Sequence, residues 1–188
     1  MKLFYTLFVL FFSILSFADE TTAISHGGFG GPVIKMTDIY DRTTPMIGGK
    51  GAYLVEHSFY VGGAAYSVAK NNEYKSPATI KQKYNFSYAG VILGYLFTPS
   101  KNFHINTQLL LGSAITFLYV PNSKKSIELS SADYSFVSEA EIGILYDVNR
   151  FLKIELSSGF RYVHPTQYFT SQELNGYSLN LGFWFGKY

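Results

Sequence analysis

The feature that most constrains the fold of this chain is an alternation of side-chain character between Ser135 and Val163. Every second residue is mostly apolar or aromatic, as at Phe136 and Ile142, and the residues between them are mostly charged or small, as at Glu139 and Arg161. Successive side chains of a β-strand point to opposite faces, whereas an amphipathic helix repeats about every 3.6 residues. The alternation therefore predicts strands with one apolar face and one polar face.

Alternating segments of this kind fill most of the chain from Gly30 onward, and residues typical of turns separate them. The composition agrees with strands, because 18% of the residues are aromatic, 17 are Gly and only 15% are charged. No convincing helix and no second domain accompany them. We predict an all-β domain with eight antiparallel strands in up-and-down order, at residues 30–40, 45–56, 59–69, 84–97, 103–119, 134–147, 152–164 and 174–187.

The connections between these segments alternate in length after a short first one. Residues 70–83, 120–133 and 165–173 form long connections, and the connections between them are short. Successive connections of an up-and-down sheet lie at opposite ends, so the long loops share one end and the tight turns share the other end with both termini. The segments also reach the length of about 9–11 residues that a tilted strand needs to cross a membrane. This asymmetry is typical of outer-membrane barrels.

Two closed barrels fit this pattern. A soluble lipocalin-like carrier has its apolar face inside, and a membrane barrel has its apolar face outside. Three observations favour the membrane barrel: aromatic residues lie near the ends of the apolar face, the polar face is rich in small residues, and it carries charges of both signs in mid-strand. We therefore predict an eight-stranded antiparallel up-and-down transmembrane β-barrel, with the soluble carrier as an alternative.

Parity then places a set of charged residues inside the barrel. They are Lys35, Lys50, Glu56, Glu139, Glu141, Lys153, Glu155 and Arg161. Four acids and four bases can neutralise one another, which matters because an unpaired buried charge is strongly penalised. Arg161 follows Glu139 on the next strand, and we expect these two side chains to interact. We interpret the set as a structural, salt-bridged network in an interior too full to conduct, with an ion path or a catalytic dyad as the alternative.

Two segments break the alternation. In 84–97 the aromatic residues change parity, since Tyr88 and Tyr95 fall on opposite faces, and we expect a β-bulge near Ala89 and Gly90. Segment 59–69 is apolar or small on both faces. The register of both segments therefore stays open at this stage.

The first residues resemble a targeting segment. Lys2, an apolar run and the small residues Ser16 and Ala18 predict a secretory signal peptide over 1–18, with cleavage after Ala18. The mature barrel domain is then 19–188, exported to the outer membrane. The chain has no Cys, so it has no disulfide and no lipid attachment point. A net charge of +2 gives no argument for binding nucleic acid.

Four features of the sequence together indicate a resemblance to a known group of proteins. They are the predicted signal peptide, the strand count, the loop asymmetry and the aromatic Tyr188 at the C-terminus. The chain resembles the small eight-stranded outer-membrane proteins of the OmpA-transmembrane-domain and OmpX type, over the whole mature chain. That group includes adhesion or defence proteins, barrel anchors and a few lipid-modifying enzymes. The resemblance therefore implies the fold but does not choose the function.

The enzymatic alternatives are a rim enzyme acting on lipid A or one acting on peptides. Outer-membrane lipid A deacylases have a His and a Ser two residues apart, and this chain has Thr166 where His164 would require Ser. Asp133 and His164 are weak rim candidates for peptide hydrolysis. The four His are scattered without metal-ligand spacing. We predict no enzymatic activity, no cofactor and no metal.

The long loops are the remaining part of the sequence that indicates a function. We predict a structural or surface-interaction protein that presents residues 70–83 and 120–133. Their basic residues would contact phosphates of lipopolysaccharide or another surface anion, and they are Lys70, Lys75, Lys81, Lys83, Lys124 and Lys125. The predicted partners are outer-membrane lipids and a surface ligand bound through the loops. We expect a monomer.

Overall fold

The computed structural model describes residues 26–39, 42–56, 58–69, 72–75, 81–97, 102–121, 127–165 and 171–187. The predicted signal peptide lies outside these residues. The basic side chains of the long loops also lie outside the described part of the structure.

Within the described residues the chain forms strands and one short helix, whose bounds follow. They are β1 His26–Ile39, β2 Arg42–Val55, β3 Phe59–Val68, β4 Asn72–Lys75, β5 Lys81–Phe97, β6 Phe103–Pro121, β7 Ile127–Asn149, β8 Leu152–Val163, α2 Ser171–Leu174 and β9 Gly176–Lys187. Each of the eight predicted segments corresponds to one long strand. The short β4 and α2 were not predicted. None of the helices in the described residues is long and apolar enough to cross a membrane.

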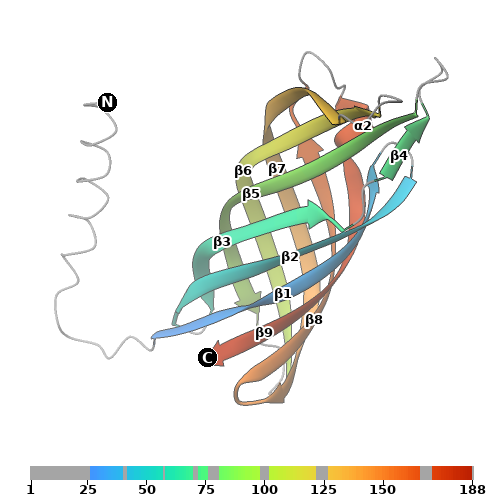
Figure 1. The fold of residues 1–188 in the computed structure, drawn as a ribbon. Coiled ribbons are helices and arrows are strands. Elements are labelled where there is room, and N and C mark those ends of the chain that lie inside the picture. Colours follow the sequence, from blue (N-terminus) through green and yellow to red (C-terminus); the bar gives the residue numbers. More distant parts are fainter. Residues whose placement is uncertain are drawn as a thin grey trace, which may run out of the picture.

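The strands close into a barrel. Neighbouring strands pair in antiparallel fashion, β1 pairs with β9, and β3 pairs with β5, which completes a ring of eight strands. The short β4 pairs with β5 and continues that hairpin beyond the ring. The predicted all-antiparallel eight-stranded barrel is therefore confirmed (Figure 1).

The two ends of the barrel differ as the loop lengths predict. The start of β1, the end of β9 and the tight connection between β7 and β8 lie at one end (Figure 1). The elements β4 and α2, which interrupt the long connections, lie at the opposite end. We call these the turn end and the loop end.

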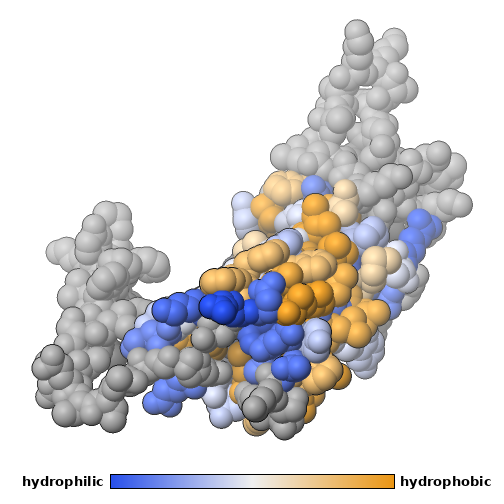
Figure 2. Space-filling model, turned by 90° about the horizontal axis from the view of Figure 1, so that it is seen from below, coloured by the Kyte–Doolittle hydropathy of each residue, from blue (hydrophilic) through white to orange (hydrophobic). Residues whose placement is uncertain are grey.

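The apolar face of the strands points outward. Phe136 and Ile142 are 53% and 60% exposed, whereas Glu139 and Arg161 are both 1% exposed. Figure 2, a view from below, shows hydrophobic residues over much of the outer wall. This orientation is the one predicted for a membrane barrel, and it is the reverse of what a lipocalin-like carrier requires.

The predicted bulge in β5 is wrong. Phe86, Tyr88 and Ile92 all face the interior and are buried, and the pairing of β5 with β3 and β6 continues without a register shift. Aromatic residues of β5 lie on both faces because the interior also accommodates aromatic rings. The Phe86 ring centroid, for example, lies 5.1 Å from the guanidinium carbon of Arg161. The register shifts lie instead on β7, at its pairings with β6 and β8 near the strand ends. Aromatic character alone therefore does not mark the lipid face.

The predicted interior position of Glu56 is also wrong. The strand β2 ends at Val55, and Glu56 lies in the turn before β3, where it is exposed. Its φ of 51° lies in the left-handed region. Parity fails here because the chain reverses direction, so Glu56 no longer follows the alternation of the strand.

Candidate functional site

The other predicted interior residues lie inside the barrel and are buried. They are Lys35 on β1, Lys50 on β2, Glu139 and Glu141 on β7, and Lys153, Glu155 and Arg161 on β8. Strands β1 and β2 supply only bases, and their long side chains reach across the lumen toward the acids of β7 and β8. The barrel therefore brings together residues about a hundred positions apart in the chain, such as Lys35 and Glu141 with a separation of 106.

The first group, the Lys35 cluster, consists of Lys35, Glu139, Glu141, Tyr66 and Tyr88. The Lys35 ammonium forms ion pairs with Glu139 and, at 2.5 Å, with Glu141. The Tyr88 hydroxyl donates to Glu139, and the Tyr66 ring centroid lies 4.0 Å from Lys35 Nζ. One ammonium thus holds two buried carboxylates, which makes Lys35 the residue on which this part of the interior depends.

The second group, the Lys50 cluster, is built around Glu155. Lys50 Nζ lies 2.6 Å from Glu155 Oε2, Asn106 Nδ2 donates to Oε1 at 2.6 Å, and Trp184 Nε1 donates to Oε2 at 2.9 Å. Gln108 links the clusters, because it accepts from Lys50 at 3.2 Å and donates to Glu141 at 3.3 Å. The Lys35 and Lys50 clusters therefore form one connected network.

Aromatic rings fill the lumen beside the Lys50 cluster. Phe29 stacks on Trp184 with ring centroids 3.8 Å apart, and Tyr60 meets both rings edge-on at 5.3 and 5.8 Å. Lys50 Nζ lies 4.7 Å from the Trp184 ring, and the Tyr60 hydroxyl donates to Asn106 at 2.9 Å. Charged and aromatic side chains thus pack against each other within the interior.

Arg161 does not pair with Glu139 as predicted. The two residues are direct partners in the β7–β8 register, yet the guanidinium donates to the carbonyl oxygens of Leu174, at 3.0 and 3.1 Å, and of Asp38, at 3.2 Å. Register fixes where two Cα atoms lie but not which way a long side chain extends. Arg161 extends toward the loop end, where the last carbonyl of α2 needs a donor, and Glu139 binds Lys35 instead.

Lys153 belongs to a separate group near the turn end, which we call the mouth triad. Lys153 Nζ lies 2.5 Å from Asp147 Oδ1, and His104 Nε2 lies 3.1 Å from the same oxygen. His104 and Lys153 are 3.3 Å apart. The Asp147 side chain is 25% exposed, so this group meets solvent while the two central clusters do not.

The rim candidates do not form a site. The backbone N–H of His164 donates to the Phe136 carbonyl at 2.9 Å, which places His164 beside Phe136, three residues along β7 from Asp133. Asp133 has the inward parity of β7, whereas His164 continues the outward parity of β8 and is exposed. Within the described ranges, no group of His, Asp and Glu residues is arranged to hold a metal ion.

Several residues of the network were missed by the charge count alone. Asn106 and Gln108 lie on the polar face of their segment, so parity could have found them. Tyr66 and Tyr88 lie on the two segments whose register was ambiguous in the sequence. Trp184 could be assigned to the inner face by parity, but nothing in the sequence indicates that its N–H binds Glu155.

The structure is similar to several solved structures of other proteins. The chain matches no protein-family model and no curated protein sequence. The structure of Ail, the attachment invasion locus protein of Yersinia pestis, is similar with a TM-score of 0.53 at 12% identity, covering 86% of this chain and 97% of Ail.

Two other structures give the same result. The N-terminal β-barrel domain of Pseudomonas aeruginosa OprF has a TM-score of 0.50 at 13% identity, covering 84% of this chain and 96% of that domain. Neisserial surface protein A has a TM-score of 0.50 at 11% identity, covering 88% of this chain and 99% of that protein. At sequence identities this low, the similarity is evidence for a shared fold alone. The chain therefore has the fold of the small eight-stranded outer-membrane β-barrels, as its sequence predicts.

Proposed function

We propose that this protein is a non-conducting outer-membrane barrel that presents its long loops, residues 70–83 and 120–133, to a partner at the cell surface. The statement that the barrel does not conduct is supported by the connected network across the lumen. Lys35 and Lys50 reach from β1 and β2 to acids on β7 and β8, and all these side chains are buried. An eight-stranded barrel has an interior just wide enough for its side chains to fill. Ions would have to separate these pairs to pass.

The second half of the proposal rests on the chemistry of the loop end. Ail has also been solved in complex with the heparin analogue sucrose octasulfate, in a structure that matches this chain with a TM-score of 0.54 at 11% identity over 88% of this chain and 99% of that one. In the present chain the long loops carry six Lys residues, which suit a polyanion. We propose an anionic surface partner, either lipopolysaccharide phosphates or a sulfated polysaccharide.

A rim enzyme is the less favoured function. Its two weak candidates, Asp133 and His164, have opposite parity and do not converge on a shared site. We propose that the protein acts without an enzymatic step and without a cofactor, as a monomer.

The test combines conductance and binding measurements on protein refolded into lipid bilayers. We expect no steady open state in a planar bilayer, and salt-sensitive binding of sucrose octasulfate or lipopolysaccharide. The double variant Lys124→Gln and Lys125→Gln should bind several-fold more weakly, because each Lys contributes to the local positive potential. The matched control, Arg150→Gln, removes a charge from the turn end and should bind normally. A stable open channel, or equal binding by all three proteins, would contradict the proposal.

A further inference from the structure

The outer wall of the barrel is uneven. On β8 and β9 the outward residues are mostly large, such as Leu156, Phe160 and Leu179. On β2, β3, β5 and β6 many outward residues are small and together form what we call the small-residue groove. Its floor consists of Gly49, Gly51, Gly63, Ala65, Ser67, Ser87, Ala89 and Ser113. The outward side chains over these four strands are therefore smaller than those over β8 and β9.

The strand register aligns these residues. Gly49 pairs with Ala65, Ala65 with Ala89, and Ala89 with Ser113, so four adjacent strands carry small residues at one level. The next level pairs Ile47 with Ser67 and Ser67 with Ser87. Because the strands of such barrels tilt by roughly 35–45°, a row across four strands runs obliquely down the wall.

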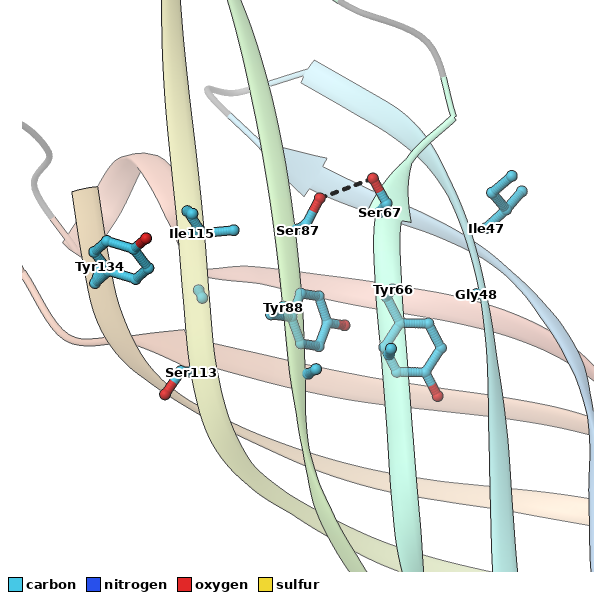
Figure 3. Close-up of a pocket in the computed structure, with 12 residues that line it drawn as sticks. Ile47, Gly48, Tyr66, Ser67, Ser87, Tyr88, Ser113, Ile115 and Tyr134 are labelled. Atoms are coloured by element: carbon cyan, nitrogen blue, oxygen red, sulfur yellow. Dashed lines mark hydrogen bonds between the residues drawn. The ribbon is translucent and has the colours of Figure 1, made fainter. Parts of the chain in front are cut away.

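The alignment produces a real concavity. One cavity of about 520 Å³ and another of about 440 Å³ lie on this wall, and Ala65 and Ala89 line both, so they form one elongated depression. Ile47, 56% exposed, and Tyr134, 70% exposed, project on either side of the first cavity. Figure 3 shows these two side chains on opposite sides of the strands that form the floor.

The groove is built for a dry environment. The hydroxyls of Ser67 and Ser87 lie 2.8 Å apart and hydrogen-bond to each other (Figure 3). A polar group in the hydrocarbon region has no water to bind, so it must be satisfied within the protein. Each of these two hydroxyls therefore has a partner within the protein, and the first cavity is lined otherwise by Ala, Gly, Ile and Tyr together with Ser113.

We propose that the small-residue groove binds one acyl chain of a membrane lipid. The inference rests on the embedding of the barrel, in which hydrocarbon chains already cover the outward face. A gap there would forfeit dispersion contacts, so a chain that settles between Ile47 and Tyr134 is favoured over one that passes above them.

A second copy of the barrel fits the groove less well. Its wall is convex and rigid, and it would rest on the projecting Ile47 and Tyr134 side chains before it reached Ala65 and Ala89. A flexible chain can follow an oblique depression that spans both cavities. Either a phospholipid or lipopolysaccharide can supply such a chain, because the groove recognises hydrocarbon.

The test uses the full protein in phospholipid vesicles that contain a phosphatidylethanolamine with a photoactivatable group on its acyl chain. After illumination, labelled peptides are identified by mass spectrometry. We expect labelling concentrated on β2, β3, β5 and β6. The variant that fills the floor, Ala65→Leu with Ala89→Leu, should lose this labelling several-fold. The matched control, Ser158→Leu on the outward face of β8, should label like the wild type. Lipopolysaccharide added to the vesicles shows, by competition, which lipid supplies the chain.

Three outcomes would overturn the inference. Uniform labelling around the wall, with unchanged labelling of the filled variant, would mean that lipid covers the groove without binding in it. Cross-linked dimers joined through Ala65 or Ala89 would assign the groove to a second copy. Absence of label everywhere, with release of the protein without detergent, would instead refute the membrane location on which the inference rests. If the double variant assembles poorly, the single variant Ser113→Leu provides the same comparison.

Discussion

Replacing Lys35 by Met should strongly destabilise the barrel. Lys35 is fully buried and is the ion-pair partner of both Glu139 and Glu141, so the substitution leaves two buried carboxylates without a cation. Removing one member of a buried pair costs about 3–5 kcal/mol. Solvent does not reduce this cost, since the Glu139 and Glu141 side chains are only 1% and 3% exposed. Tyr88 and Gln108 still donate to the carboxylates, which favours the lower part of that range.

A double-mutant cycle tests whether Lys35 or Arg161 is the partner of Glu139. Glu139→Gln in the Lys35→Met protein removes one of the two stranded charges, and it should recover part of the loss, about 0.5–3 kcal/mol. The assay is urea unfolding of the four proteins in liposomes. The matched cycle combines Glu139→Gln with Arg161→Met, and should show the smaller coupling because Arg161 binds carbonyl oxygens. Additive effects in the Lys35 cycle, or stronger coupling in the Arg161 cycle, would refute this reasoning.

Three further predictions address the wall, the strand contacts and the lumen. Ile142→Arg places a charge on the lipid face, where it costs about 2–4 kcal/mol near the midplane, so the heat-modifiable folded band on a gel should weaken. Gly112→Val should prevent assembly in the same assay, because a Cβ there would lie 2.0 Å from the Ala89 carbonyl oxygen. Gly30→Ala is its control and should fold, since its nearest atom is 3.6 Å away. In planar bilayers, Lys35→Met should show more transient current than the closed wild type, and equal silence would mean that other side chains seal the lumen.

Much of the fold could be predicted from the sequence because strand parity is local. The alternation around Phe136 and Glu139 shows which residues of β7 share the inner face and which share the outer face, without knowledge of any other strand. The loop lengths predict which end of the barrel carries the long loops. The facing of β5 could not be predicted, because Phe86 and Tyr88 suit the lipid face and the interior equally well. Glu56 shows a related limit, since parity applies only as far as the strand extends.

The partners within the network could be predicted less well than its members. Parity gives each charged residue a face, but the lumen brings together strands that are not neighbours in the sheet. Lys35 on β1 meets Glu139 on β7 across the barrel, whereas Arg161, the register partner of Glu139, extends to α2. The directions in which long side chains extend across the closed ring and the position of α2 decide these contacts, and no spacing in the sequence encodes either of them.

The ionic interior also has a role in specifying which face points outward. A slip of one residue in strand pairing turns every side chain to the opposite face. In a barrel with apolar residues on both faces such a slip would cost little, but here it would move charged residues such as Lys35 and Glu139 into lipid, at up to about 2–4 kcal/mol for a base near the midplane. The strands that carry these charges, β1, β2, β7 and β8, are therefore held in one facing by their own sequence. Strands β3 and β5 have no such charge among their inward residues with described side chains, and their sequences are the ambiguous ones. Their facing must come from pairing with β2, which carries Lys50, and with β6, whose own facing is set by the inward polar residues Asn106 and Gln108.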